Sequence, residues 1–213
     1  MRTAPLAAGA IVVGLFAWLF GPVLVGDRLF AFRDVAHFYY PLFEYVHQSL
    51  AAGQAPLWNP LENLGQPLAG NPTASVFYPG KLLFWLPLEY DRAFGLYLAA
   101  HWLLAVAGAF LLARHWKGSF SAAATAAIAY AMSGAVLFTV TNVIYLVGAA
   151  WLPLAWLAAD RMLRCRSVQA AVGLGAVLAL MILGGDPQAA YHAGLWMLGY
   201  AFWIWWDQRN GGL

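Results

Sequence analysis

The residues best suited to chemistry fall into two short polar groups. Asp34 and His37 stand one helical turn apart, and Asp186, Gln188 and His192 follow a long apolar stretch. A carboxylate and an imidazole at this spacing can work as an acid–base pair or supply two ligands to a divalent metal. Two ligands are a weak metal signal, so we expect no cofactor, with a divalent metal as the alternative.

Both aspartates also have a purely structural interpretation. Asp34 precedes an apolar periodicity and Asp186 precedes Pro187, and aspartate is favoured at the residue that caps the first turn of a helix. For Asp34 the two interpretations are compatible. For Asp186 the sequence favours neither.

The chain that positions these residues is too apolar for a water-soluble protein. Of its 213 residues 63% are hydrophobic and only 9% are charged, whereas soluble domains have roughly 25% charged residues. The basic residues form no dense run, which excludes a nucleic-acid partner. The single cysteine, Cys165, excludes an intramolecular disulfide. We therefore expect an all-α integral membrane protein.

Apolar stretches that can cross a bilayer recur along the chain. The first, residues 5–25, carries no charge and has no clear cleavage site, so we expect a retained span. Thr139, Thr141 and Asn142 interrupt a later stretch and indicate a tight turn. The pattern predicts about six spans, at residues 5–25, 93–113, 120–139, 143–159, 168–183 and 189–206.

The distribution of charge predicts a cytoplasmic N-terminus. In that orientation most of the basic residues lie inside and most of the acidic residues lie outside, as the positive-inside rule requires. Residues 1–213 then form a single transmembrane domain, and residues 26–92 form its large extracytoplasmic loop. The turn at residues 184–188 faces the same outer compartment.

The outer loop is expected to begin with an amphipathic interfacial helix. Apolar residues recur at helical spacing over residues 35–52, which predicts a helix lying along the membrane surface. Pro41 predicts a kink or a fresh start near Tyr40, because proline removes a helical hydrogen-bond donor. Beyond Gly53, closely spaced prolines and asparagines indicate a rigid, ordered loop. Residues 81–88 are apolar but too short to span, and should be interfacial or re-entrant.

Several other polar side chains can bind a ligand or serve the structure. Asn59 and Asn71 each precede a proline, where asparagine caps a turn more often than it contacts a sugar. Trp58 can stack on a sugar ring or anchor the loop at the membrane interface. His101 lies within the second span, where we expect it to bond to a neighbouring helix.

The loop and the later turn resemble the start of the YfhO family of bacterial multi-pass membrane proteins. Members of that family are much longer and more often have histidine at the position of Asp186. The motifs that carry the resemblance are Asp34, Phe38-Tyr39-Tyr40-Pro41, Pro56-Leu57-Trp58-Asn59-Pro60, Gly65-Gln66-Pro67, Asn71-Pro72, Tyr78-Pro79 and Gly184-Gly185-Asp186-Pro187-Gln188.

The resemblance implies a GT-C-like glycosyltransferase of the bacterial plasma membrane. It would transfer a sugar from a polyprenyl-phosphate donor to a cell-surface glycopolymer or glycolipid at the outer face, among membrane lipids. Asp34 is then the implied catalytic base, since a phosphate leaving group needs no general acid. Arg33 and Lys81 would stabilise the phosphate charge, while Arg28 is expected to reach towards lipid headgroups. The implied substrate-binding residues are Arg33, His37, Tyr40, Trp58, Asn59, Asn71, Lys81, Asp186, Gln188 and His192.

Two other functions fit the same residues. One is a lipid-binding or transport protein without chemistry, in which the basic residues hold headgroups. The other is a fragment that needs a partner chain, because the sequence stops at Leu213, just after the sixth expected span.

Overall fold

The computed structural model describes residues 3–209, which are mostly helical. The long helices are α1 (Thr3–Leu24), α3 (Tyr90–His115), α4 (Phe120–Ala131), α6 (Val143–Cys165), α7 (Val168–Leu183) and α8 (Pro187–Arg209). The short elements are a π-helical turn (Val35–Tyr39), α2 (Tyr40–Ala51), α5 (Gly134–Leu137) and two 3-10 helices (Pro79–Trp85 and Phe138–Thr141). Strands β1 (Trp58–Asn59) and β2 (Gln66–Pro67) pair antiparallel, with Trp58 opposite Pro67.

Within the described residues, three helices are long and apolar enough to cross a membrane: Pro5–Leu24 of α1, α3 and α6. A fourth span results if α4 and residues Gly134–Thr141, which are bent by 43° to each other, are counted together. This count is lower than the six spans predicted. Helix α7 has only 16 residues, and α8 has 23 but is rich in tryptophan and tyrosine, which lower its hydropathy.

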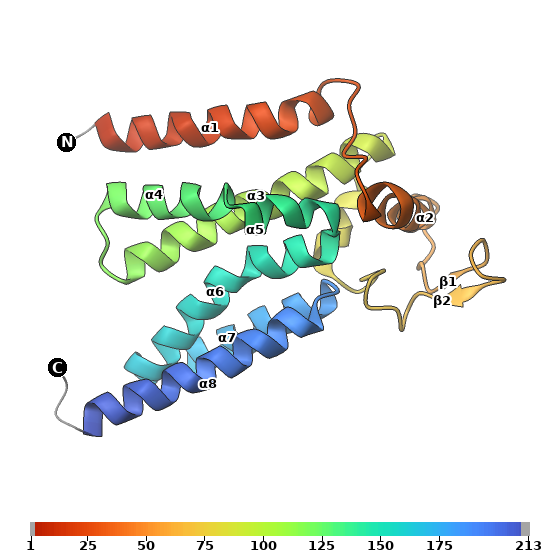
Figure 1. Ribbon diagram of the computed structural model, residues 1–213. Coiled ribbons are helices and arrows are strands. Elements are labelled where there is room, and N and C mark those ends of the chain that lie inside the picture. The colour runs from red at the N-terminus through yellow and green to blue at the C-terminus, as the bar shows by residue number, and fades with distance from the viewer. Residues whose placement is uncertain (1–2, 210–213) are drawn as a thin grey trace.

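Helices α3 and α6 form the centre of the bundle. Helix α3 packs against α4 and α6, and α6 also contacts α7 and α8 (Figure 1). Glycines permit the close approaches. A Cβ at Gly95 of α3 would clash with Val23 of α1, and one at Gly108 would press on Leu154 of α6.

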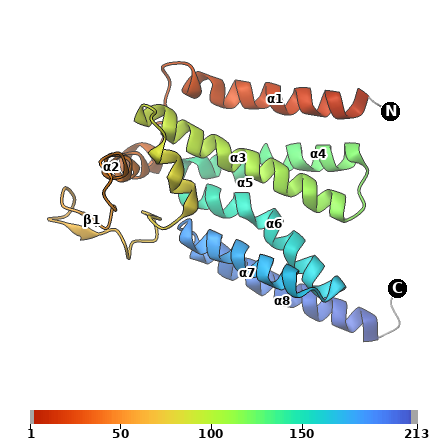
Figure 2. The same ribbon diagram turned by 180° about the vertical axis from the view of Figure 1, so that it is seen from behind.

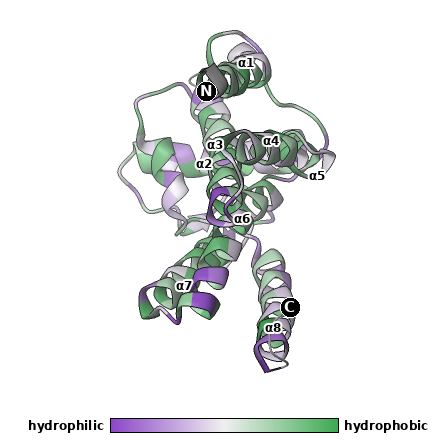
Figure 3. Ribbon diagram, turned by 90° about the vertical axis from the view of Figure 1, so that its left-hand side faces the viewer, coloured by the Kyte–Doolittle hydropathy of each residue, from purple (hydrophilic) through white to green (hydrophobic). Residues whose placement is uncertain are grey.

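Different segments of the chain lie at the two ends of the bundle. The loop that follows α1 and the α7–α8 turn lie at one end, and the start of α1 and the end of α8 lie at the other (Figures 1 and 2). The structure thus places the first loop and residues 184–188 at the same end of the bundle. Hydrophobic residues cover most of the helices, and hydrophilic residues gather towards the C-terminal end of α8 (Figure 3).

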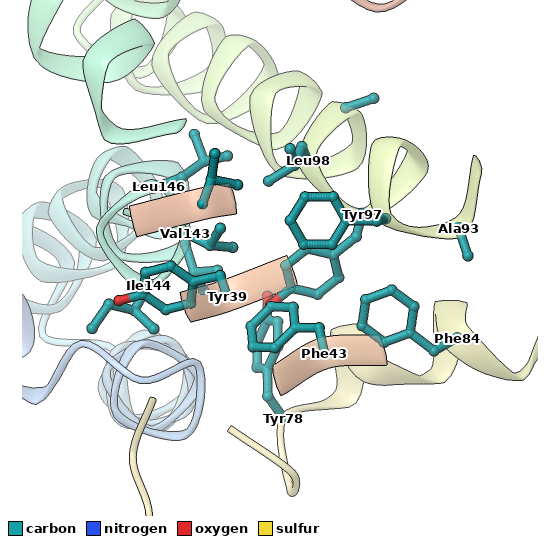
Figure 4. Packing of buried hydrophobic residues seen from close by; sticks show 14 of the residues in the cluster. Tyr39, Phe43, Tyr78, Phe84, Ala93, Tyr97, Leu98, Val143, Ile144 and Leu146 are labelled. Atoms are coloured by element: carbon teal, nitrogen blue, oxygen red, sulfur yellow. The ribbon is translucent and has the colours of Figure 1, made fainter. Parts of the chain in front are cut away.

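The predicted helix over residues 35–52 is confirmed, including its fresh start. A π-helical turn changes to α-helix at Tyr40, immediately before Pro41. Its apolar face, however, packs into the main core of the protein, where Tyr39 and Phe43 meet side chains of α3 and α6 (Figure 4). The other core residues labelled there are Tyr78, Phe84, Ala93, Tyr97, Leu98, Val143, Ile144 and Leu146. The helix is therefore a structural part of the bundle and joins the loop firmly to it.

Candidate functional site

Asp34 lies where an irregular segment enters the loop helix. The preceding residue, Arg33, has a left-handed backbone with φ 56°, and both side chains are exposed. Asp34 occupies the N-cap position of the π-helical turn, but its side chain accepts no capping hydrogen bond. The carboxylate is thus available to another partner at the surface.

An apolar cavity of about 500 Å³ opens beside this aspartate. Its walls come from Leu19 and Phe20 of α1, from residues 29–32 and Val35, and from Leu137, Val140 and Thr141 after α4. Arg33 and Asp34 lie between the wall residues Phe32 and Val35 in the chain, but neither lines the cavity. The Arg33 guanidinium lies 5.8 Å from the centroid of the Phe138 ring. An exposed cation and an exposed carboxylate are therefore next to wall residues of a hydrophobic hollow along the chain.

Tyr39 connects this segment to the start of α6. Its hydroxyl donates a hydrogen bond to Asn142 Oδ1 at 2.5 Å. Burial raises the pKa of Tyr39, and the neighbouring Tyr145, Asp34 and Asp186 raise it further. Both aspartates thus contribute to the electrostatic environment of the same phenol.

Asp186 caps α8, as its structural interpretation proposed. Its Oδ1 accepts a hydrogen bond from the Ala189 backbone N–H at 2.8 Å, and the residue is only 4% exposed. Burial raises the pKa of its carboxyl group, although the Ala189 N–H and His192 oppose that shift. Gly148 of α6 leaves the room that this carboxylate occupies, since a Cβ there would overlap it.

The α7–α8 turn rests on the first outer loop. Gly185 has φ 101°, and a Cβ at this residue would collide with the Pro72 carbonyl oxygen and with Ile144. Asp186 and His192 line a cleft between α6 and α8, whereas Gln188 is exposed and is not part of its wall. The structure therefore brings Asp186 and His192 together and leaves Gln188 apart.

The asparagines of the loop are turn residues, as the sequence favoured. Asn59 is 4% exposed and its Oδ1 accepts from the Leu61 N–H at 3.0 Å. Asn71 Oδ1 accepts from the Thr73 N–H, also at 3.0 Å. Trp58 keeps an exposed side chain that lies against Gly65. These contacts hold the loop in shape.

A second, more polar cavity of about 350 Å³ lies between α2 and the loop. His37 and Asn59 contribute to it, together with Glu44, Tyr45 and Glu62. Neither glutamate was predicted as a site residue, and the two are 18 positions apart along the chain. The one indication in the sequence is that Glu44 lies beside the apolar face of the predicted helix.

Lys81 does not reach the candidate site. The residue is 2% exposed, and its Nζ lies above the Phe43 ring and 4.9 Å from the centroid of the Tyr97 ring. No group in the described residues forms a hydrogen bond with this Nζ, and burial lowers its pKa well below the usual value. The structure therefore does not support the expected contact between Lys81 and a lipid phosphate.

Tyr40 and His101 both form hydrogen bonds within the protein, Tyr40 near the surface and His101 in the interior. The Tyr40 hydroxyl donates to the carboxylate of Asp91 at the start of α3. His101 forms hydrogen bonds of 2.7 Å with the Tyr78 hydroxyl and with the Tyr97 carbonyl oxygen of its own helix. Its expected link to a neighbouring helix is indirect, since Trp151 of α6 donates to the same Tyr78 hydroxyl.

The described residues contain no group of three or more His, Cys, Asp or Glu side chains that could hold a metal ion. No family model matches the chain, and no curated protein or solved structure matches it significantly. The resemblance to the YfhO family thus rests on the quoted motifs alone.

Proposed function

We propose that the protein is a membrane glycosyltransferase of the GT-C-like, YfhO type. It transfers a sugar from a polyprenyl-phosphate donor to a cell-surface glycopolymer or glycolipid. The observation that supports this proposal is the apolar cavity whose wall residues Phe32 and Val35 flank the exposed Arg33 and Asp34 in the chain. A lipid-linked donor needs a hydrophobic hollow for its chain, a cation for its phosphate and a carboxylate near the reacting carbon.

The proposed reaction uses few groups of the protein. The acceptor hydroxyl oxygen attacks the anomeric carbon of the donor sugar while the bond from that carbon to the phosphate oxygen breaks. Asp34 accepts the proton of the attacking hydroxyl, and the phosphate leaves as an anion without needing a general acid. Arg33 offsets the negative charge on the leaving phosphate.

The proposed topology places this site at the outer face of a bacterial plasma membrane, with the N-terminus in the cytoplasm. Helices α7 and α8 add two spans to those formed by α1, α3, the α4–α5 pair and α6. Both pack against α6, so they follow it through the bilayer. With 16 residues α7 is about 24 Å long, and a locally thinner bilayer accommodates it.

A second candidate is a lipid-binding or transport protein that performs no chemistry. The apolar cavity supports this function equally, because it explains the binding of a lipid chain without any role for Asp34 as a base.

The test measures sugar transfer and donor binding side by side. The full chain in liposomes receives labelled polyprenyl-phosphate sugars and membrane acceptors. Asp34→Asn should lower turnover about 100-fold or more, the usual contribution of a general base, and should retain donor binding. Asp27→Asn is the matched control, because Asp27 is an exposed aspartate in the same linker. Donor binding without turnover by the wild type would instead establish the lipid-binding function.

A further inference from the structure

The cleft between α6 and α8 is a second hollow, separate from the cavity beside Asp34. It has a volume of about 500 Å³ and shares no wall residue with that cavity. Tyr145, Leu152 and Trp156 line it from α6, and His192 and Trp196 line it from α8. Asp186 closes it at the α7–α8 turn. We refer to it as the α6–α8 cleft.

The α6–α8 cleft is polar at one end and apolar along the rest of its length. Tyr145 and Asp186 belong to the end of the bundle that carries the outer loop. Trp156 and Trp196 lie 11 and 10 residues further along their helices, about 15 Å deeper at the rise of an α-helix. Small and apolar residues, including Leu152, separate the two ends. A molecule that fills this cleft therefore has one polar group and an apolar chain.

The polar end contains a carboxylate that forms no ion pair with a described Lys or Arg. Asp186 uses Oδ1 to cap α8, and none of the described groups donates to Oδ2. Removing a carboxylate from water without a partner is costly, and here 96% of the residue's surface is removed, since its exposed fraction is 4%.

The cleft supplies a further feature that an ammonium ion prefers. The aromatic ring of Tyr145 belongs to the polar end, and the faces of aromatic rings attract cations, whereas Trp156 and Trp196 belong to the apolar end. The one basic side chain in its wall is His192, which is exposed. A purely anionic headgroup would meet the Asp186 carboxylate without compensation, whereas an ammonium group would pair with it.

We propose that the α6–α8 cleft binds an amphiphile through its primary ammonium group, with Asp186 as the counter-ion and the apolar chain lying between α6 and α8. An aminophospholipid such as phosphatidylethanolamine has this chemistry. Its ammonium donates to Asp186 Oδ2, and one acyl chain runs along Leu152 towards Trp156 and Trp196.

The experiment measures which lipid stays bound to the purified full chain. The protein is extracted from bilayers containing equal amounts of phosphatidylethanolamine, phosphatidylcholine and phosphatidylglycerol, and its bound lipids are counted by native mass spectrometry. We expect phosphatidylethanolamine to be retained about tenfold over phosphatidylcholine. The latter carries a quaternary ammonium that donates no hydrogen bond to a carboxylate, and a tenfold preference corresponds to about 1.4 kcal/mol.

The deciding variant is Asp186→Asn. Asparagine keeps an oxygen that can cap α8, so the fold is retained while the charge is removed. This variant should lose the preference for phosphatidylethanolamine, whereas Asp207→Asn, the same change near the other end of α8, should keep it. Equal retention of the three lipids by the wild type would overturn the proposal, as would an unchanged preference in Asp186→Asn.

A competition experiment distinguishes a lipid ligand from a soluble amine. Free ethanolamine is added at concentrations that exceed the lipid, and bound phosphatidylethanolamine is counted again. Retention of the lipid supports an amphiphile as the ligand, and its full displacement would assign the site to a small amine instead. No sugar donor takes part, so either result is independent of the glycosyl transfer proposed for Asp34.

Discussion

The hydroxyl of Tyr39 donates to Oδ1 of Asn142 and thereby ties the helix after Asp34 to the turn that precedes α6. Tyr39 is the sixth residue after Arg33 in a segment that starts with a left-handed backbone and continues as a π-helical turn. Such irregular backbone needs contacts to hold it. The position of the candidate base therefore depends on a hydrogen bond made about 100 residues further along the chain.

Tyr39→Phe should loosen this segment without disturbing the core. The ring stays in place, and the loss of one partly buried hydrogen bond should lower the free energy of unfolding by about 1 kcal/mol. Sugar transfer should fall more than donor binding, because the base is displaced while the cavity remains. Thermal melting and turnover measure the two effects. Tyr191→Phe is the control, since Tyr191 is exposed; equal losses in both variants would refute the role of Tyr39.

Lys81→Met should stabilise the protein. Methionine fills the space among Phe43, Phe84 and Tyr97 and removes an ammonium that has no hydrogen-bond partner. Burial depresses the pKa of Lys81, so the folded state binds its proton less well than the unfolded state. Stability is therefore lost as pH falls below the unfolded pKa of about 10.4.

The expected gain at neutral pH is about 1–3 kcal/mol, the range for burying an unpaired polar group. Melting curves of wild type and Lys81→Met should also diverge further as pH is lowered. Lys117→Met provides the control, because Lys117 is exposed and should respond by less than about 0.5 kcal/mol. A less stable Lys81→Met would show that attraction between the ammonium and the aromatic rings outweighs the cost of burying it.

Features that depend on neighbouring residues were predictable from the sequence. Pro41 indicated the change of helix at Tyr40, and Asn59 and Asn71 cap turns because each is followed by a proline. The turn before α6 was signalled by Asn142 and the two threonines before it. In each case the signal and the structure lie within a few residues of each other.

Features that depend on distant packing were not predictable. The sequence suggests that Lys81 is a surface cation. In the structure, Phe43 of α2 and Tyr97 of α3 enclose its ammonium group. The carboxylate of Asp186 occupies space that Gly148 leaves free, and these residues are 38 positions apart. The six predicted spans exceed the three or four helices that are long and apolar enough, because α7 is short and α8 is rich in tryptophan.

Asp186 should make the stability of the protein depend on pH. Burial raises the pKa of its carboxyl group above the unfolded value of about 3.9, so the folded state holds this proton more tightly. Stability from this group is present below pH 4 and is lost as pH rises through the folded pKa. The groups that face it are His192 on α8, Tyr145 on α6 and Tyr39 in the loop helix.

Asp186→Asn should abolish that loss, because asparagine does not titrate in this range. The measurement is the difference in melting temperature between variant and wild type from pH 4 to pH 8. The contributions of the other carboxylates are the same in both proteins and cancel in this difference. The variant should gain relative to the wild type as pH rises in the absence of an amine ligand. A constant difference across the range would mean that Asp186 ionises as easily in the folded protein as in the unfolded chain.

Asp160 connects three helices at the end of the bundle opposite the candidate site. The residue is 1% exposed, and its carboxylate accepts from His115 of α3 at 2.7 Å, from Arg164 at 2.8 Å and from Tyr200 of α8 at 2.5 Å. The sequence does not single out this residue, because partners 45 and 40 positions away are not visible in a linear pattern. Its role is to hold α8 against α3 and α6.

Asp160→Ala should therefore lower the free energy of unfolding by about 2–3 kcal/mol, the value of charge-assisted hydrogen bonds to a buried acceptor. Most of this comes from His115 and Tyr200, because Arg164 is half exposed and solvent screens its charge. Tyr200→Phe should cost about 1 kcal/mol, and combining it with Asp160→Ala should cost less than the sum of the two. Denaturant titrations of the wild type, the two single variants and the double variant measure these losses. Additive losses would mean that the aspartate and the tyrosine do not act as one unit.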